Sequence, residues 1–370
     1  MITLSIRHSI VHIVLMVLFV AGCSLQRRPE DLPSSEINWQ NLQVTPQSRG
    51  ALCLDISARK EPSWEDAKRE TESGLFTAIY PADPAQSREI GDSTFSVDAY
   101  KPQTINLRLW YPKGNERSSL SLRMFLLLDD KQLSGAIGEE PYYDVELQKG
   151  SETTIQFRIP PLEPGNHDVI AVAISYPQDY PNPEGTVVVI AWRMTFIVPP
   201  ASSTFKKISF ESFPAEALIS AGGPKLVLEL MRKQDKFVVW NWPNPWLDID
   251  ANSSIEFFAL AAHEYVDNLD APSLEKLKAS FFSLLFFIDY QQIEIAPDET
   301  AIYGKVGKDT AYTRIPITIK SPPAGKHDLL VLRIDSPGVP ICILKGDSHG
   351  RILPNSVYGK LVGINVLPPK

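Results

Sequence analysis

The stretch Leu126-Leu127-Leu128-Asp129-Asp130-Lys131-Gln132-Leu133 returns 160 residues later in related form, as Phe286-Phe287-Ile288-Asp289-Tyr290-Gln291-Gln292-Ile293. The same offset aligns further segments without a gap: Tyr143 with Tyr303, Ile155–Ile159 with Ile315–Ile319, Gly165–Asp168 with Gly325–Asp328, and Pro177 with Pro337. After a small insertion in the second copy, Ile197–Pro200 matches Val366–Pro369. Because these matches share one register, they indicate an internal duplication. The repeat is far longer than a solenoid unit, so each copy is expected to be a whole domain.

Each copy contains the pattern of a strand, a tight turn and a second strand. Polar and apolar residues alternate over 154–159 and again over 314–319, which predicts half-buried antiparallel strands. Gly165 and Gly325 come next and predict a tight turn with positive φ. The segment 125–128 is apolar at every position, which predicts a central strand that is buried on both faces.

Proline is abundant, with 31 residues, and it clusters in the predicted connections between short strands. Helical periodicity is scarce, so the chain is predicted to be all-β. The short strands and Pro/Gly turns resemble those of immunoglobulin-like and fibronectin type III-like sandwiches, although the Cys…Trp…Cys spacing of true immunoglobulin domains is absent. The resemblance implies two tandem immunoglobulin-like β-sandwich domains. Small helical insertions are expected near 63–73, 214–220 and 273–280, the first from the capping-box pattern Ser63-x-x-Asp66.

The repeat also sets the expected domain boundaries. The last strand of the first copy ends at Pro199-Pro200, and Ala201–Thr204 is a short polar linker. The first sandwich is therefore expected at 46–200 and the second at 201–370. Residues 23–45 have few apolar side chains to bury, which predicts a flexible tether.

Residues 1–22 have the pattern of a secretory signal, with Arg7, the apolar run Ile10–Val20, and Ala21-Gly22 directly before Cys23. This pattern resembles the lipobox of bacterial lipoproteins, which implies cleavage after residue 22 and a diacylglyceryl group on the Cys23 thiol. The chain is therefore expected to be exported and lipid-anchored to the bacterial cell envelope. Its place would be the outer membrane or the outer face of the cytoplasmic membrane. The alternatives are a plain secretory signal with an incidental cysteine, or an uncleaved anchor.

The charge of the chain argues against nucleic acid as a partner. The formal net charge is −8, and the basic residues are dispersed, so there is no basic patch that a phosphate backbone would require. Arg27-Arg28 is too short to bind anionic lipid by itself. The expected partners are the membrane, through the lipid on Cys23, and an unidentified envelope protein or glycan.

His167-Asp168 and His327-Asp328 occupy equivalent positions after the turn glycines. A His/Asp pair could serve acid–base chemistry or bind a metal, or it could satisfy the turn backbone at the start of a strand. The same pair in both copies favours the structural interpretation. The segment Asp248–Asn252 begins like a calcium loop, but it has Ser253 where the loop needs glycine and Ala259 where it needs the bidentate glutamate.

The stretch Trp240-Asn241-Trp242-Pro243-Asn244-Pro245-Trp246 holds three of the seven tryptophans. If exposed, Trp240, Trp242 and Trp246 could stack on sugars or contact a partner protein; if buried, they would close one end of the second sandwich or the interdomain seam. Cys53 and Cys342 lie among apolar residues and are expected to be buried free thiols, with a disulfide as the alternative.

Motifs for phosphate loops, dinucleotide binding, serine hydrolases and zinc proteases are absent from the sequence. No catalytic residue, cofactor or metal is predicted. The chain is therefore expected to be a non-catalytic binding, adhesion or envelope-assembly module. The alternative is a surface carbohydrate-binding or glycoside-hydrolysing lipoprotein, which would use the tryptophans and a pair of carboxylates.

Overall fold

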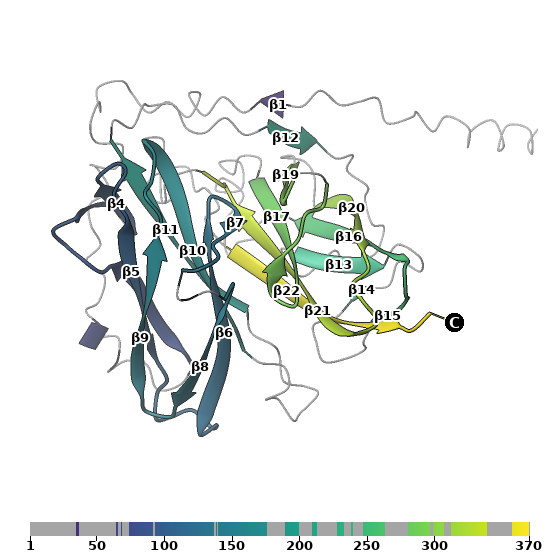
Figure 1. Cartoon of the computed structure of the whole chain (residues 1–370), viewed down its shortest axis with the longest axis horizontal. Helices are drawn as coiled ribbons and strands as arrows, with labels where there is room; N and C mark the ends of the chain where they lie inside the picture. The colour runs from purple at the N-terminus through teal and green to yellow at the C-terminus, as the bar shows by residue number, and fades with distance from the viewer. Residues whose placement is uncertain are drawn as a thin grey trace, which may run out of the picture. The chain divides into compact units, whose positions relative to one another are not determined.

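The structure is a computed structural model of the chain (Figure 1). It describes residues 35–36, 64–65, 68, 74–91, 93–136, 138, 140–175, 189–199, 209–212, 228–232, 238–239, 247–262, 280–296, 299–306, 312–338 and 357–369. Most of the described residues lie in strands, as the sequence predicts. Among them, no helix is long and apolar enough to cross a bilayer.

The first sandwich consists of two sheets, coloured blue to teal in Figure 1. One sheet has the order β2-β5-β9, and the other has the order β3-β4-β11-β10-β6-β7, with β8 also paired to β6. The strands are β2 Phe76–Pro81, β3 Ser87–Gly91, β4 Thr94–Val97, β5 Gln103–Trp110, β6 Ser119–Leu128, β7 Lys131–Gln132, β8 Tyr143–Gln148, β9 Glu152–Ile159, β10 Gly165–Ser175 and β11 Val189–Val198.

The second sandwich repeats this plan. One sheet has the order β14-β13-β16-β20, and the other has the order β1-β12-β19-β17-β21-β22-β15, with β18 also paired to β17. The strands are β1 Ser35–Glu36, β12 Ser209–Ser212, β13 Leu228–Arg232, β14 Val238–Val239, β15 Leu247–Asp250, β16 Ser254–Ala262, β17 Ser280–Ile288, β18 Gln291–Gln292, β19 Ala301–Val306, β20 Tyr312–Lys320, β21 Gly325–Asp335 and β22 Val357–Leu367.

The strand order is that of an immunoglobulin-like sandwich. Strands β2, β5 and β9 face a sheet built on β6, β10 and β11, which is the division of first, second and fifth strands against third, sixth and seventh. In the second sandwich β13, β16 and β20 face β17, β21 and β22 in the same way. Even the parallel pairing of β4 with β11 returns, as β15 with β22. The prediction of two tandem immunoglobulin-like sandwiches is confirmed.

Hairpin pairing corrects one detail of the repeat. Gly165 pairs with Val198, and the equivalent Gly325 pairs with Val366, whereas the sequence match aligns Val198 with Leu367. The sequence match follows the proline pairs, which end both strands because proline has no N–H for the ladder. The second copy holds one more residue, Leu367, before its prolines.

The segments outside the two sandwiches are described only in part. Trp64, Glu65 and Lys68 are helical, within the predicted insertion at 63–73. The predicted insertions at 214–220 and 273–279 lie outside the described residues, and Ser280 begins β17 instead of ending a helix. Ser35 and Glu36 belong to the predicted tether, yet they pair with β12 as an edge strand. The predicted boundary at 200/201 lies outside the described residues.

Each sandwich buries its own core, and a third core lies between the sandwiches. Along β6, Met124 and Leu126 point into the first sandwich. Phe125 and Leu127 point the other way and pack against residues of the second sandwich, among them Phe287. The segment 125–128 is thus apolar on both faces because its outer face covers a neighbouring domain. Ser34–Lys370 form one compact unit.

Candidate functional site

Two tight turns of identical geometry stand at the seam between the sandwiches. Asp129-Asp130 joins β6 to β7, and Asp289-Tyr290 joins β17 to β18. All four residues have positive φ, at 49° and 69° in the first turn and 50° and 67° in the second. Positive φ at both central positions is the signature of a type I′ hairpin turn, which aspartate tolerates better than most residues.

The first residue of each turn holds the histidine that the sequence singles out. Asp129 Oδ2 lies 2.6 Å from His167 Nδ1, and Asp289 Oδ2 lies 2.7 Å from His327 Nδ1. The other ring nitrogen of each histidine faces a carbonyl oxygen, that of Glu163 at 2.9 Å and that of Pro323 at 2.8 Å. Because both nitrogens of each ring meet acceptors, the contacts favour the protonated imidazolium.

We term the Asp129–His167 and Asp289–His327 contacts the histidine clasps. Each clasp holds its turn to the strand that begins at Gly165 or Gly325. The same aspartate that binds the histidine also accepts the N–H of the next residue, Asp168 or Asp328, each at 3.0 Å. This supports the structural interpretation of His167-Asp168 and His327-Asp328. The partner that sequence reasoning missed is the Asp129/Asp289 position, whose signal was its identity in the two copies of the repeat.

The clasps make stability depend on pH. Burial alone would lower the pKa of both histidines, but the hydrogen bonds and charges of Asp129 and Asp289 outweigh it, so each pKa is raised. A histidine whose pKa is raised in the folded state stabilises the fold fully at pH values below its unfolded-state pKa of about 6.5. This stabilisation is lost as the pH rises through the folded-state pKa. We therefore expect the free energy of unfolding to fall as pH rises above about 6.5.

Proton NMR titration of the histidines checks this expectation. Both clasp midpoints should lie above the ordinary histidine pKa. Asp129→Asn should lower the midpoint of His167 and leave that of His327 in place, while Asp289→Asn should do the reverse. Midpoints that stay in place in both variants would mean that the aspartates do not hold the protons.

The two copies differ in an ion pair through which the first sandwich contacts the second. Arg193 of β11 pairs with Asp168 of β10, with Nη2 to Oδ2 at 2.7 Å and Nε to Oδ1 at 3.2 Å. Both side chains are only 3% exposed. The other copy has Leu361 at the strand position of Arg193, opposite Leu330 as Arg193 is opposite Ile170.

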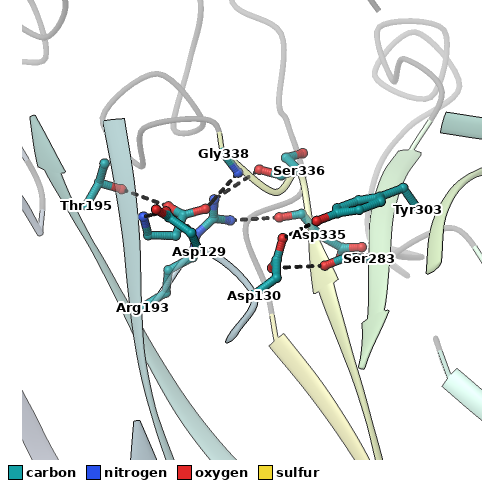
Figure 2. Close-up of polar contacts among 10 residues, drawn as sticks. Asp129, Asp130, Arg193, Thr195, Ser283, Tyr303, Asp335, Ser336 and Gly338 are labelled. Atoms are coloured by element: carbon teal, nitrogen blue, oxygen red, sulfur yellow. Dashed lines mark hydrogen bonds and ion pairs between the residues drawn. The ribbon is translucent and has the colours of Figure 1, made fainter. Parts of the chain in front are cut away.

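Arg193 and Asp168 both bind the backbone at or just after the end of β21. Figure 2 labels Arg193 together with Asp335, Ser336 and Gly338. Arg193 donates from Nη1 to the Asp335 carbonyl at 2.7 Å and from Nη2 to the Ser336 carbonyl at 2.9 Å. Asp168 Oδ2 accepts the N–H of Gly338 at 2.7 Å. A buried guanidinium with several aligned acceptors gains charge-assisted hydrogen bonds in exchange for its lost hydration. This ion pair therefore fixes one sandwich to the other.

Asp130 makes the second buried polar contact between the sandwiches, as Figure 2 shows. Its carboxylate accepts from the Tyr303 hydroxyl at 3.0 Å and lies 3.3 Å from the Ser283 hydroxyl. Burial, together with the Asp130 charge, raises the pKa of Tyr303 far above its ordinary value. Tyr303 therefore keeps its proton and serves as a hydrogen-bond donor.

Glutamines from the two copies bind each other reciprocally. The Gln132 N–H donates to Gln292 Oε1, and the Gln292 N–H donates to Gln132 Oε1, both at 2.7 Å. Their side-chain amides donate in turn to the carbonyls of Tyr290 and Asp130, at 2.9 and 2.8 Å. Equivalent residues thus exchange equivalent bonds, as in an isologous interface between two subunits.

We define the polar seam as Asp130, Asp168, Arg193, Ser283, Tyr303 and the backbone of 335–338. Its chemistry is that of a structural contact between the two sandwiches. Its ionised groups are occupied by hydrogen bonds that join the sandwiches. Within the described ranges, no three His, Cys, Asp or Glu side chains are arranged to hold a metal ion. The calcium-like segment instead forms β15 and a turn, with Asp248 accepting from Asn365 at 2.7 Å.

The site residues named from the sequence are not tested by the structure. Cys23, Trp240, Trp242 and Trp246 lie outside the described residues, as do Cys53 and Cys342. The lipid attachment at Cys23 and the role of the tryptophans therefore stay predictions.

Comparison with known proteins gives no family. No family model matches the chain, and no curated protein matches it. Among solved structures, the CARDB domain of a Pyrococcus furiosus protein, solved with di-metal ions, matches 36% of this chain and 97% of its own at 15% identity and a TM-score of 0.22. Native alpha-2-macroglobulin from Escherichia coli matches 59% of this chain at 11% identity and a TM-score of 0.23.

A β-glucosidase from Erythrobacter marinus matches 34% of this chain at 11% identity and a TM-score of 0.18. The chain spans 23% of the macroglobulin and 16% of the β-glucosidase. Similarities at these TM-scores assign the chain to none of these families, and the immunoglobulin-like fold is given by its own strand order.

Proposed function

We propose that the chain is an exported, lipid-anchored and non-catalytic module, whose two sandwiches act as one rigid unit in binding, adhesion or envelope assembly. The observation that carries the rigid unit is the buried Asp168–Arg193 pair, bound to the backbone of the second sandwich. Domains in one chain usually move relative to each other unless their interface is large and apolar. Here an apolar core and the polar seam both join the sandwiches.

A rigid pair of sandwiches suits binding because a preorganised surface loses less entropy when it meets its partner. The signal pattern before Cys23 supports export and a lipid anchor. Anchoring would be strong, since each buried methylene of the acyl chains contributes about 0.8 kcal/mol.

Substitution of the anchor cysteine tests the localisation. The Cys23→Ser protein should move from the membrane fraction to the soluble extracytoplasmic fraction almost completely, because it can no longer receive the acyl chains. Cys53→Ser is the matched control and should stay with the membrane. Membrane retention of the Cys23→Ser protein would contradict the anchor, and fractionation followed by immunoblotting decides between the two results.

The non-catalytic part of the proposal has its own test. The lipidated protein, purified from its native envelope, should retain a bound envelope protein or glycan and should not degrade polysaccharides. Hydrolysis of any member of a polysaccharide panel would instead support the glycoside-hydrolysing alternative.

A further inference from the structure

The outer face of the β2-β5-β9 sheet carries a cluster of aromatic and charged side chains. Along β5, buried residues alternate with half-buried ones, so Arg108 and Trp110 point away from the core. Phe76 of β2 and Glu152 of β9 lie opposite Trp110 on either side. With Trp64 and Lys68 these residues form what we term the aromatic–cationic patch.

Contacts with the aromatic rings position the side chains of this patch. The Trp64 and Phe76 ring centroids are 5.0 Å apart, and those of Phe76 and Trp110 are 6.4 Å apart in an edge-to-face arrangement. The Arg108 guanidinium lies 4.5 Å from the centre of the Trp64 ring, and the Lys68 ammonium lies 5.8 Å from that of Trp110. Cations at such distances from an aromatic face are attracted by its quadrupole.

Glu152 holds the cations and the indole of the patch together. It accepts hydrogen bonds from Lys68 Nζ at 2.9 Å, from Trp64 Nε1 at 3.2 Å, and from Arg108 Nε. Partial burial raises its pKa, but these three donors outweigh burial, so the pKa is lowered. Glu152 therefore stays ionised, and the side chains around it are held in position before any ligand arrives.

Beside Trp110 the surface opens into a pocket of about 510 Å³, lined chiefly by Lys68, Trp110, Pro112, Lys113, Gly150 and Glu152. Its rim is fixed by backbone bonds, since Gly150 donates to the Tyr111 carbonyl at 2.7 Å. A Cβ at Gly150 would come within 2.8 Å of Lys113 Cγ. The close approach of Lys113 to this turn therefore depends on glycine.

Among the residues that the structure describes, the second sandwich shows no equivalent of this patch. By strand register Trp110 and Glu152 correspond to Ala262 and Tyr312, and Arg108 corresponds to Leu260. The histidine clasps, which the fold uses in both copies, are identical at their aspartate and histidine positions. The second sandwich reaches the same strand order without these side chains, so the patch is not needed to build a sandwich and is open to a role in binding.

We infer that this pocket binds an acidic saccharide, an inference that rests on the proposed binding function. A pyranose ring has an apolar C–H face that can cover the Trp110 indole, as apolar surface leaves water. Its hydroxyls can bond to Glu152 and Lys68, and an acidic group on the sugar can pair with Lys113. Lys113 is exposed and lines the pocket, so it places a positive charge beside an incoming ligand.

Titration calorimetry with defined probes tests the inference on the Cys23→Ser chain, which contains every described residue. A galacturonic acid trimer should bind, and a neutral galactose trimer should bind at least about tenfold more weakly. Trp110→Ala and Lys113→Glu should each weaken binding of the acidic trimer by about tenfold, which corresponds to about 1.4 kcal/mol. Lys149→Ala removes a nearby exposed lysine outside the pocket and should change the affinity less than twofold.

Lys113→Glu changes only an exposed side chain, so it keeps the test valid should Trp110→Ala fail to fold. Equal affinity for tripolyphosphate would overturn the saccharide assignment, because it would show attraction to any polyanion. Binding that survives both pocket variants, or no binding of the acidic trimer, would also overturn it, yet neither result would touch membrane anchoring or the joining of the sandwiches. Cleavage of the bound trimer would refute the non-catalytic function while leaving the site in place.

Discussion

Arg193→Met should reduce the free energy of unfolding by about 3–5 kcal/mol, because it leaves the carboxylate of Asp168 buried without its cation. The variant also loses the donors to the carbonyls of Asp335 and Ser336. Methionine approximates the length of the arginine stem, so the loss of packing is small. Chemical denaturation of the Cys23→Ser chain, followed by tryptophan fluorescence, measures the change.

Arg158→Met is the matched control, since Arg158 lies exposed on β9. It should change stability by no more than about 0.5 kcal/mol. The double variant Asp168→Asn/Arg193→Met should recover part of the loss, because a neutral amide is less costly to bury than an unpaired carboxylate. A change below about 1 kcal/mol for Arg193→Met alone would show that the pair does not fasten the sandwiches.

Phe125→Ala and Phe287→Ala should each cost about 3–5 kcal/mol, the range for removing a buried aromatic ring. Both side chains are almost fully buried, and their rings lie 5.0 Å apart in the apolar core between the sandwiches. Because each residue contributes to the core between the sandwiches, the double variant should lose less than the sum. The expected coupling is about 0.5–1.5 kcal/mol, the value of an aromatic pair.

Tyr143→Ala serves as the control for these aromatic variants, since Tyr143 on β8 is 40% exposed. It should cost well under 1 kcal/mol. Strict additivity of Phe125→Ala and Phe287→Ala would mean that the two rings do not depend on each other, and the seam would then be a loose contact.

Much of the fold can be predicted from the sequence because the duplication shows each pattern twice. Alternation over 154–159 and 314–319 gives β9 and β20. Gly165 and Gly325 have the expected positive φ, but they are the first residues of β10 and β21 and do not stand in a tight turn. The identity of Asp129 and Asp289 could also have revealed the histidine clasps. A polar pair that recurs at one offset together with its partner indicates a hydrogen bond that the fold needs.

The contacts between the copies could not be found in this way. Arg193 has Leu361 as its counterpart, so the repeat gives no hint of its role, and its partners in the second sandwich are backbone carbonyls. The aromatic–cationic patch is hidden for a related reason. Trp110 and Glu152 are brought together by strand register, which depends on the pairing of β5 with β9 and not on spacing along the chain.

The apolar segment 125–128 shows that a strand can be apolar on both faces for two different reasons. Its two-sided hydrophobicity predicts a central strand, and β6 does lie inside its sheet. Yet Phe125 and Leu127 are buried by the other sandwich and not by a layer of their own domain. One sequence cannot tell these environments apart, because both remove the same apolar surface from water.

Scanning calorimetry of the Cys23→Ser chain tests most directly whether the two sandwiches form one unit. If the apolar core and the polar seam join the sandwiches as described, the chain unfolds in a single transition whose calorimetric and van't Hoff enthalpies agree. Two separate transitions, or a calorimetric enthalpy about twice the van't Hoff value, would show that the sandwiches unfold independently and would contradict the account.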